Sequence, residues 1–178
     1  MIKITDLSHE IIELNNPINC AVDMTAGLGN DTIFLSKISK KVYAFDIQKI
    51  ALEKTNELLK LNKINNVTLI NDDHQFIQNY IDELIDLAIY NLGYLPNSSK
   101  EIRTETTSTL KSLIILLEKL TINGQIVIVL YPHNKEEVIE VENYCMSLNN
   151  DFDVLKYQII NKTNAPFIIK IKKMRSSL

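Results

Sequence analysis

A glycine turn behind an apolar run is the first segment of the chain with residues suited to ligand binding. It runs from Asp23 to Thr32 and contains Gly27 and Gly29, two of only four glycines in 178 residues. Glycine lets a backbone approach a ligand closely, and the start of a following helix offers free N–H groups. The segment therefore predicts a binding turn between a strand and a helix, although a tight turn with a helix cap would by itself also explain it.

The charges of this turn favour a cationic ligand over a pyrophosphate. A dinucleotide site has a third glycine where this chain has Thr32, and the Asp31 carboxylate would repel phosphate oxygens, which disfavours a nucleotide-binding reductase. S-adenosylmethionine (AdoMet) carries a sulfonium and an ammonium, whose charge the Asp23 carboxylate can balance. The residues expected to bind AdoMet in this segment are Asp23, Thr25, Gly27, Gly29, Asn30, Asp31 and Thr32.

Two later apolar runs end in side chains suited to a nucleoside. Asp46 follows the second run about 20 residues after the glycine turn, where a carboxylate can accept hydrogen bonds from both ribose hydroxyls of NAD or AdoMet. Asp73 and His74 follow the third run and are placed to meet an adenine ring, although Asp72 or Asp73 can instead cap the next helix. The residues expected on the nucleoside side are Asp46, Ile47, Gln48, Asp73 and His74.

The segment from Asn91 to Pro96 carries groups suited to an amine acceptor beside the cofactor. An Asn side chain accepts hydrogen bonds from an amine and aims its lone pair at a methyl group, while Tyr94 offers a face for stacking a base. Methylation of nitrogen needs alignment more than a strong base, and a strand end followed by a turn would also explain the segment. His133, after the fifth run, is a candidate proton shuttle. The candidate catalytic residues are Asn91, Tyr94 and His133, with Asn91 also expected to contact AdoMet.

Apolar runs and helical periodicity alternate along the chain. Strands are expected at 20–23, 42–45, 67–70, 85–92 and 126–131, and helices at 8–15, from 31, and at 48–62, 76–83, 104–120 and 136–148. Segments 154–160 and 167–172 are expected to pair as a terminal antiparallel hairpin. The repeats predict a single Rossmann-like α/β domain over residues 1–178, with a mostly parallel sheet. Ligands of such domains bind at the carboxyl ends of the strands, where the residues above lie.

Composition restricts the class of protein. The net charge of −3 argues against a protein that coats nucleic acid by charge alone. No apolar run approaches the ~20 residues that cross a bilayer, and the N-terminal residues lack the pattern of a signal peptide. Cys20 and Cys145 lack metal-ligand or redox spacing, so we expect buried free thiols and no metal site. These features predict a cytoplasmic protein that does not bind membranes.

Four segments together resemble one known family. They are Asp23-x-Thr-Ala-Gly-x-Gly-x-Asp-Thr-x-Phe-Leu35, Tyr43-Ala-Phe-Asp-Ile-Gln48, Asn91-Leu-Gly-Tyr-Leu-Pro96 and Pro166-Phe-Ile-Ile169. Over residues 20–172 the chain is similar to small methylases once labelled rRNA methylases, a family that includes the bacterial tRNA 5-(aminomethyl)-2-thiouridine methyltransferase. The resemblance implies AdoMet-dependent N-methylation of the aminomethyl group of 5-aminomethyl-2-thiouridine at the wobble position, in the anticodon loop of tRNA. It also implies a homodimer.

The resemblance assigns residues and leaves alternatives open. The residues that match the family's cofactor and acceptor segments are Asp23, Thr25, Gly27, Gly29, Asp31, Asp46, Gln48, His74, Asn91, Gly93 and Tyr94. The loop at 131–136 lacks the glycine of the family's Gly-His loop, so the resemblance does not assign a role to His133. A methyltransferase of the same fold that acts on rRNA, a small molecule or a protein stays an alternative. A non-catalytic RNA-binding module is disfavoured by the charge and by the intact cofactor segment.

Overall fold

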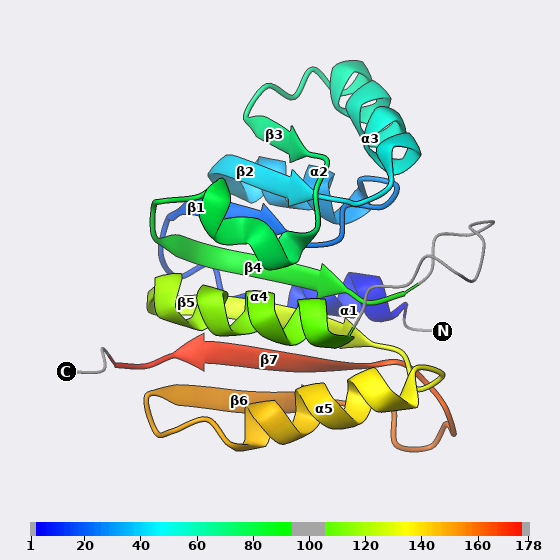
Figure 1. Ribbon diagram of the computed structural model, residues 1–178, viewed down its shortest axis with the longest axis vertical. Coiled ribbons are helices and arrows are strands. Elements are labelled where there is room, and N and C mark those ends of the chain that lie inside the picture. Colours follow the sequence, from blue (N-terminus) through cyan, green and yellow to red (C-terminus); the bar gives the residue numbers. More distant parts are fainter. Residues whose placement is uncertain (1–2, 94–105, 176–178) are drawn as a thin grey trace.

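The computed structural model of the protein describes residues 3–93 and 106–175. They form a seven-stranded sheet flanked by helices (Figure 1). The strands are β1 (Ile18–Asp23), β2 (Ser39–Phe45), β3 (Val67–Ile70), β4 (Ile85–Asn91), β5 (Leu120–Leu130), β6 (Phe152–Tyr157) and β7 (Phe167–Lys173). The helices are α1 (Ile4–Glu10), α2 (Asn30–Ile38), α3 (Lys49–Leu61), the 3₁₀ helix η1 (His74–Asn79), α4 (Thr106–Lys119) and α5 (Lys135–Met146).

The strand order is β3-β2-β1-β4-β5-β7-β6. The first five of these strands pair in parallel, and β7 pairs antiparallel with both β5 and β6. The order reverses between β1 and β4, which lie side by side. In open α/β sheets, ligands bind in the crevice at such a reversal. The predicted Rossmann-like sheet with a C-terminal antiparallel hairpin is confirmed.

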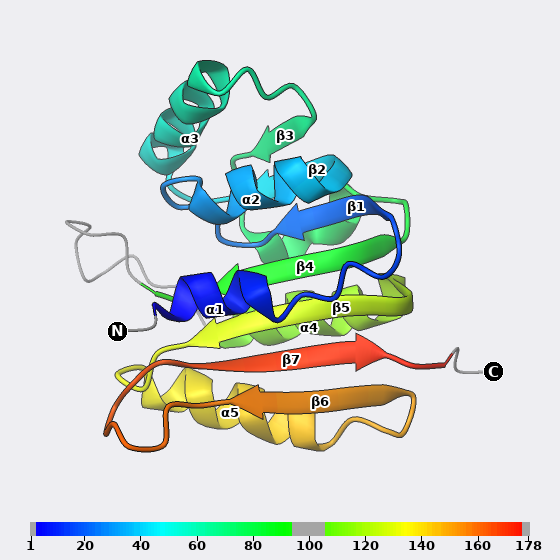
Figure 2. The same ribbon diagram turned by 180° about the vertical axis from the view of Figure 1, so that it is seen from behind.

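Helices cover both faces of the sheet. α4, α5 and η1 lie on the face seen in Figure 1, and α1 and α2 lie on the face seen in Figure 2. In β5, Ile126, Ile128 and Leu130 belong to the core on the α4 side, whereas Val127 and Val129 belong to the core on the α1 side. Successive residues of a strand point to opposite faces, so a strand covered on both sides is apolar throughout. This explains the continuous apolar run of β5.

The first helix was predicted wrongly, because α1 lies earlier in the chain than 8–15. Side chains of the distant strands β5 and β7 bind the backbone groups that a longer helix would use. The Gln125 amide exchanges two hydrogen bonds with the backbone of Glu13, at 2.9 and 2.8 Å. Lys170 Nζ donates to the Ile11 carbonyl oxygen at 2.8 Å. The chain after α1 is therefore tied to the sheet and leaves the helix.

The helix after β3 and the start of β5 also differ from prediction. The helix expected at 76–83 is instead the 3₁₀ helix η1, because the Asp73 carboxylate accepts a hydrogen bond from the Gln75 amide at 2.9 Å and starts the helix earlier. Phe76 then adopts a non-helical backbone, with φ −96° and ψ 20°. β5 begins at Leu120, several residues before the expected start of the fifth strand. The elements themselves occur in the predicted order.

The two cysteines are buried free thiols, as predicted. Burial raises the pKa of Cys20 and of Cys145 to about 12 in each case. Because the thiolate is the nucleophilic and metal-binding form, these protonated side chains are inert packing residues. Among the described helices, none has the length and apolar content needed to cross a membrane.

Candidate active site

The carboxyl ends of β1 to β5 meet at one edge of the sheet, where a cleft of about 670 Å³ opens. α1 lies over the ends of β4 and β5 at this edge (Figure 2). Parts of α1, the glycine turn, the end of β4 and the loop after β5 line the cleft. The predicted site residues among its lining are Thr25, Gly27, Asn30, Asp31, Asn91 and His133. Tyr94 lies outside the described residues.

The glycine turn joins β1 to α2 with two residues in the left-handed region. Gly27 has φ 52° and Gly29, the N-cap of α2, has φ 83°. A Cβ on Gly29 would also lie 3.0 Å from side-chain atoms of Thr55. The Thr55 hydroxyl donates to the Gly27 carbonyl oxygen at 3.1 Å and fixes the turn. Gly27 therefore brings bare backbone to the cleft, and Gly29 allows the turn to pack on Thr55 at the electropositive start of α2.

Asp23 ends β1 directly beneath this turn and is fully buried. Its carboxylate accepts hydrogen bonds from the Thr25 amide at 3.1 Å and from the Thr32 hydroxyl at 2.5 Å. Burial, and next the charge of Asp31, raise the pKa of Asp23 to about 7. A cation bound nearby would stabilise the ionised form. Thr32, which replaces the third glycine of a dinucleotide site, thus fixes the Asp23 carboxylate by a hydrogen bond.

Asp46 links the end of β2 to the glycine turn. Its two carboxylate oxygens accept hydrogen bonds from the Gly27 amide at 2.9 Å and from the Gln48 amide at 2.8 Å. Burial raises its pKa. Each carboxylate oxygen keeps a further lone pair, so ribose hydroxyls can still be bound. The adjacent Ile47 is 48% exposed and offers an apolar surface beside the carboxylate.

The residues after β3 form a second polar group. Asp73 caps η1 and also accepts a hydrogen bond from the Ser108 hydroxyl at 2.9 Å, which ties α4 to this edge of the sheet. His74 is buried with its ring edge-on to Tyr90, at 5.6 Å between centroids. Burial lowers the pKa of His74 to about 4 despite the opposing charge of Asp73. Its two ring nitrogens have no hydrogen-bond partner among the described residues.

Asn91, at the end of β4, is held at the centre of the cleft. Its backbone amide donates to the Thr25 hydroxyl at 2.8 Å, and its side-chain Nδ2 donates to Asp31 Oδ2 at 3.3 Å. The Tyr131 hydroxyl donates to Asn91 Oδ1 at 3.1 Å. Gly93 makes room for that tyrosine, since a Cβ there would lie 3.0 Å from the ring. The amide orientation is thus set from both sides.

Several residues of the cleft were absent from the sequence prediction, among them Lys3, Asp6, His9 and Tyr131. Asp6 and His9 come from α1, and Asp6 lies before the start of the helix predicted at 8–15. Their spacing of three residues would place both on one face of a helix, which was the available signal. Tyr131 directly follows an apolar strand, so from the sequence it looks like another buried core residue. Its ring lies 5.8 Å from that of His133, the exposed candidate on the same loop.

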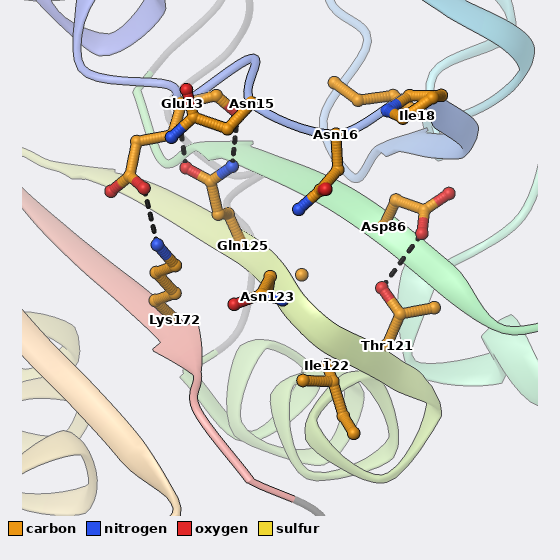
Figure 3. Close-up of a pocket in the computed structure, with 12 residues that line it drawn as sticks. Glu13, Asn15, Asn16, Ile18, Asp86, Thr121, Ile122, Asn123, Gln125 and Lys172 are labelled. Carbon is orange, nitrogen blue, oxygen red and sulfur yellow. Dashed lines mark hydrogen bonds and ion pairs between the residues drawn. The ribbon is translucent and has the colours of Figure 1, made fainter.

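A second pocket, of about 320 Å³, lies at the opposite edge of the sheet (Figure 3). Several of its polar groups bind one another: Gln125 is bonded to Glu13, Glu13 to Lys172, and the Thr121 hydroxyl to Asp86. The two lysines 170 and 172 lower the pKa of Glu13 to about 2. These side chains hold the start of the chain on the sheet, so we place the ligand site at the cleft.

Comparison with known proteins decides the family. The family model described as "Putative rRNA methylase" matches residues 42–173. The chain belongs to this family. It is 31% identical to the chloroplastic tRNA (mnm(5)s(2)U34)-methyltransferase of Arabidopsis thaliana, over 94% of this chain and 68% of the plant protein.

Solved structures that share this fold include two streptococcal proteins. A Streptococcus mutans protein described as a putative methyltransferase, in complex with SAH, has 40% identity and a TM-score of 0.90, over 98% of this chain and 99% of that chain. An rRNA methylase from Streptococcus thermophilus has 36% identity and a TM-score of 0.83, over 98% and 99%. The predictions of an AdoMet-dependent methyltransferase and of AdoMet as its cofactor are confirmed.

Proposed function

We propose that this methyltransferase methylates the aminomethyl nitrogen of 5-aminomethyl-2-thiouridine at the wobble position of tRNA. The observation that carries the proposal is the fixed Asn91 amide, which lies in the same cleft as the glycine turn and beside Asp31. An amide and a carboxylate are acceptors for the N–H groups of an amine. The plant relative named for this wobble nucleoside supports the choice of acceptor.

The residues of the cleft fit AdoMet. Gly27 and Gly29 leave room for a ligand at the start of α2, and the buried Asp23 has a raised pKa that a nearby cation would relieve. AdoMet supplies an electrophilic methyl group on a sulfonium. We assign the cofactor to the residues around the glycine turn and the ends of β2 and β3. The assigned residues are Asp23, Thr25, Gly27, Gly29, Asn30, Asp31, Thr32, Asp46, Ile47, Gln48, Asp73, His74 and Asn91.

The acceptor side is assigned from the position of Asn91 and from the sequence pattern around it. Asn91 would orient the amine so that its lone pair points along the axis of the methyl–sulfur bond, which is the main requirement of the reaction. Tyr94 would stack the base, and His133 is one candidate for removing a proton. Two carboxylates, Asp6 and Asp31, and one ammonium, Lys3, line the cleft, so its net charge favours a cationic acceptor over an anionic one.

The proposal is tested by methyl transfer from labelled AdoMet to tRNA from a strain that lacks wobble-uridine methylation. We expect label in the tRNA, and loss of labelled product when the acceptor fraction is first treated with ribonuclease. Label that survives ribonuclease would instead indicate a protein or small-molecule acceptor. Label in ribosomal RNA but not in tRNA would indicate the rRNA alternative.

Two further properties belong to the proposal. A homodimer is implied by the family resemblance, and sedimentation equilibrium should give twice the mass of the chain. A cytoplasmic location is supported by the two buried free thiols, which match a reducing compartment. Fractionation should recover the protein with tRNA and ribosomes, and recovery with membranes or in the medium would contradict it.

A further inference from the structure

His9 lines the cleft and is bound to Asp31, although no sequence pattern assigned it a role. Its Nε2 lies 2.7 Å from Asp31 Oδ1, and the ring stacks on Phe34 with 3.7 Å between centroids and an interplanar angle of 3°. The side chain is 22% exposed, and it lines the same cleft as Asn91. One carboxylate and one aromatic ring therefore fix the imidazole at the surface of the cleft.

The carboxylate of Asp31 connects this imidazole to the acceptor side. Its second oxygen, Oδ2, accepts the hydrogen bond from Asn91 Nδ2 at 3.3 Å. Asn91 in turn accepts from the Tyr131 hydroxyl at 3.1 Å. His9 and Asn91 thus bind opposite oxygens of one carboxylate and line the same cleft.

The proposed acceptor needs a group that removes a proton. A primary alkylamine is protonated at neutral pH, as lysine is, and an ammonium has no lone pair with which to attack. The carboxylates of Asp6 and Asp31 attract the ammonium but stabilise its charged form. Alignment by Asn91 alone therefore leaves an unreactive acceptor. Histidine is the side chain most often used as a general base.

We propose that His9 is the general base of the reaction, with Asp31 as its positioning partner; this inference rests on the proposed function. With Nε2–H donated to Asp31, Nδ1 of His9 takes one proton from the acceptor ammonium. The freed lone pair forms the new N–C bond as the S–C bond breaks and leaves its electrons on sulfur. The product leaves as a methylated ammonium, and the imidazolium returns its proton to water. Asp31 stabilises the imidazolium, as the aspartate of a catalytic triad does.

Asp31 and His133 are less suited to this step. The side chain of Asp31 is only 7% exposed, and its oxygens hold His9 and Asn91 in place. His133 is exposed on the loop after β5, where the ring lies beside Tyr131. His9 lines the cleft, and its Nε2 is bound to the buried carboxylate of Asp31. A carboxylate bound to one imidazole nitrogen, with the other nitrogen left to accept a proton, is the arrangement of a catalytic triad.

The test measures the single-turnover rate of tRNA methylation with AdoMet and tRNA saturating. In His9→Gln, whose amide keeps a hydrogen-bonding group near Asp31, we expect the rate to fall by about 10²-fold or more. AdoMet affinity by calorimetry should stay within about two-fold, which also shows that the variant folds. Glu10→Gln, the exposed neighbour on α1, is the matched control and should keep the wild-type rate.

Chemical rescue separates a base from a packing residue. In His9→Ala, added imidazole can enter the space beside Phe34 and should raise the single-turnover rate of the variant at least ten-fold. If His9 only packed against its neighbours, added imidazole would leave that rate unchanged. A wild-type rate in His9→Gln, or no rescue in His9→Ala, would overturn the assignment. So would loss and imidazole rescue at His133 with His9 variants fully active. If the wild-type enzyme does not methylate tRNA at all, the proposed function fails and this inference fails with it.

Discussion

Asp23 makes AdoMet binding depend on pH in a direction that can be measured. In the ligand-free protein, burial and then the Asp31 charge raise the pKa of Asp23 from 3.8 to about 7. A bound cation favours the carboxylate, so the pKa is lower in the complex and binding releases a proton. The affinity for AdoMet therefore rises as the pH increases through about 7.

The expected size follows from the burial of the carboxylate. Two unit charges about 5 Å apart interact by about 3 kcal/mol at an effective dielectric constant of about 20. This energy corresponds to about two pKa units. Each unit changes the affinity by at most a factor of ten. AdoMet should thus bind up to about 100-fold more weakly at pH 5 than at pH 8.

Calorimetry of wild type and Asp23→Asn across this pH range is the assay. The α-amino group of AdoMet also titrates at about pH 8, but this affects binding to wild type and to Asp23→Asn equally. The difference between the two affinities therefore isolates Asp23. We expect a large difference at high pH that disappears at low pH. A wild-type affinity that falls with acid no more steeply than that of Asp23→Asn would refute the reasoning.

Three further predictions concern single residues. Asp46→Ala should weaken AdoMet binding by about 100-fold, since two charged hydrogen bonds are lost; Asp46→Asn should lose less, and unchanged calorimetric affinity would exclude the ribose role. Asn91→Ala should lower the single-turnover rate by about 10²-fold or more with AdoMet affinity nearly intact, and full activity would exclude its acceptor role. Gly29→Ala should lower the free energy of unfolding by about 1–3 kcal/mol, because φ is 83° and the Cβ meets Thr55; an unchanged denaturation midpoint would contradict this.

The sheet was predictable because its signals are local. Parallel strands covered on both faces read as short continuous apolar runs, and Ile126–Leu130 is one of them. Polar residues and glycines then interrupt these runs at the carboxyl ends of strands. That rule brought Thr25, Gly27, Asp31 and Asn91 to one cleft. The strand ends that carry these residues can each be recognised from the local pattern.

α1 was not predictable because distant residues decide where it ends. Gln125 and Lys170 bind the backbone at Glu13 and Ile11, and neither partner can be identified from the local pattern. The error left Asp6 outside the predicted helix, and His9 was missed because its contact with Asp31 joins positions 22 residues apart. Tyr131 was missed for a related reason, since its contact with Asn91 joins positions 40 residues apart. Long-range polar contacts are thus the part of the site that sequence patterns do not give.

The most direct test of the central claim is nucleoside mass spectrometry of the wobble nucleoside after incubation of unmethylated tRNA with the enzyme and AdoMet. We predict that 5-aminomethyl-2-thiouridine is converted to a nucleoside one methyl group heavier, with the added methyl on the aminomethyl nitrogen. Asn91→Ala, as control, should bind AdoMet and give little product. An unchanged wobble nucleoside, with AdoMet bound and the methyl group found elsewhere or not transferred, would contradict the claim.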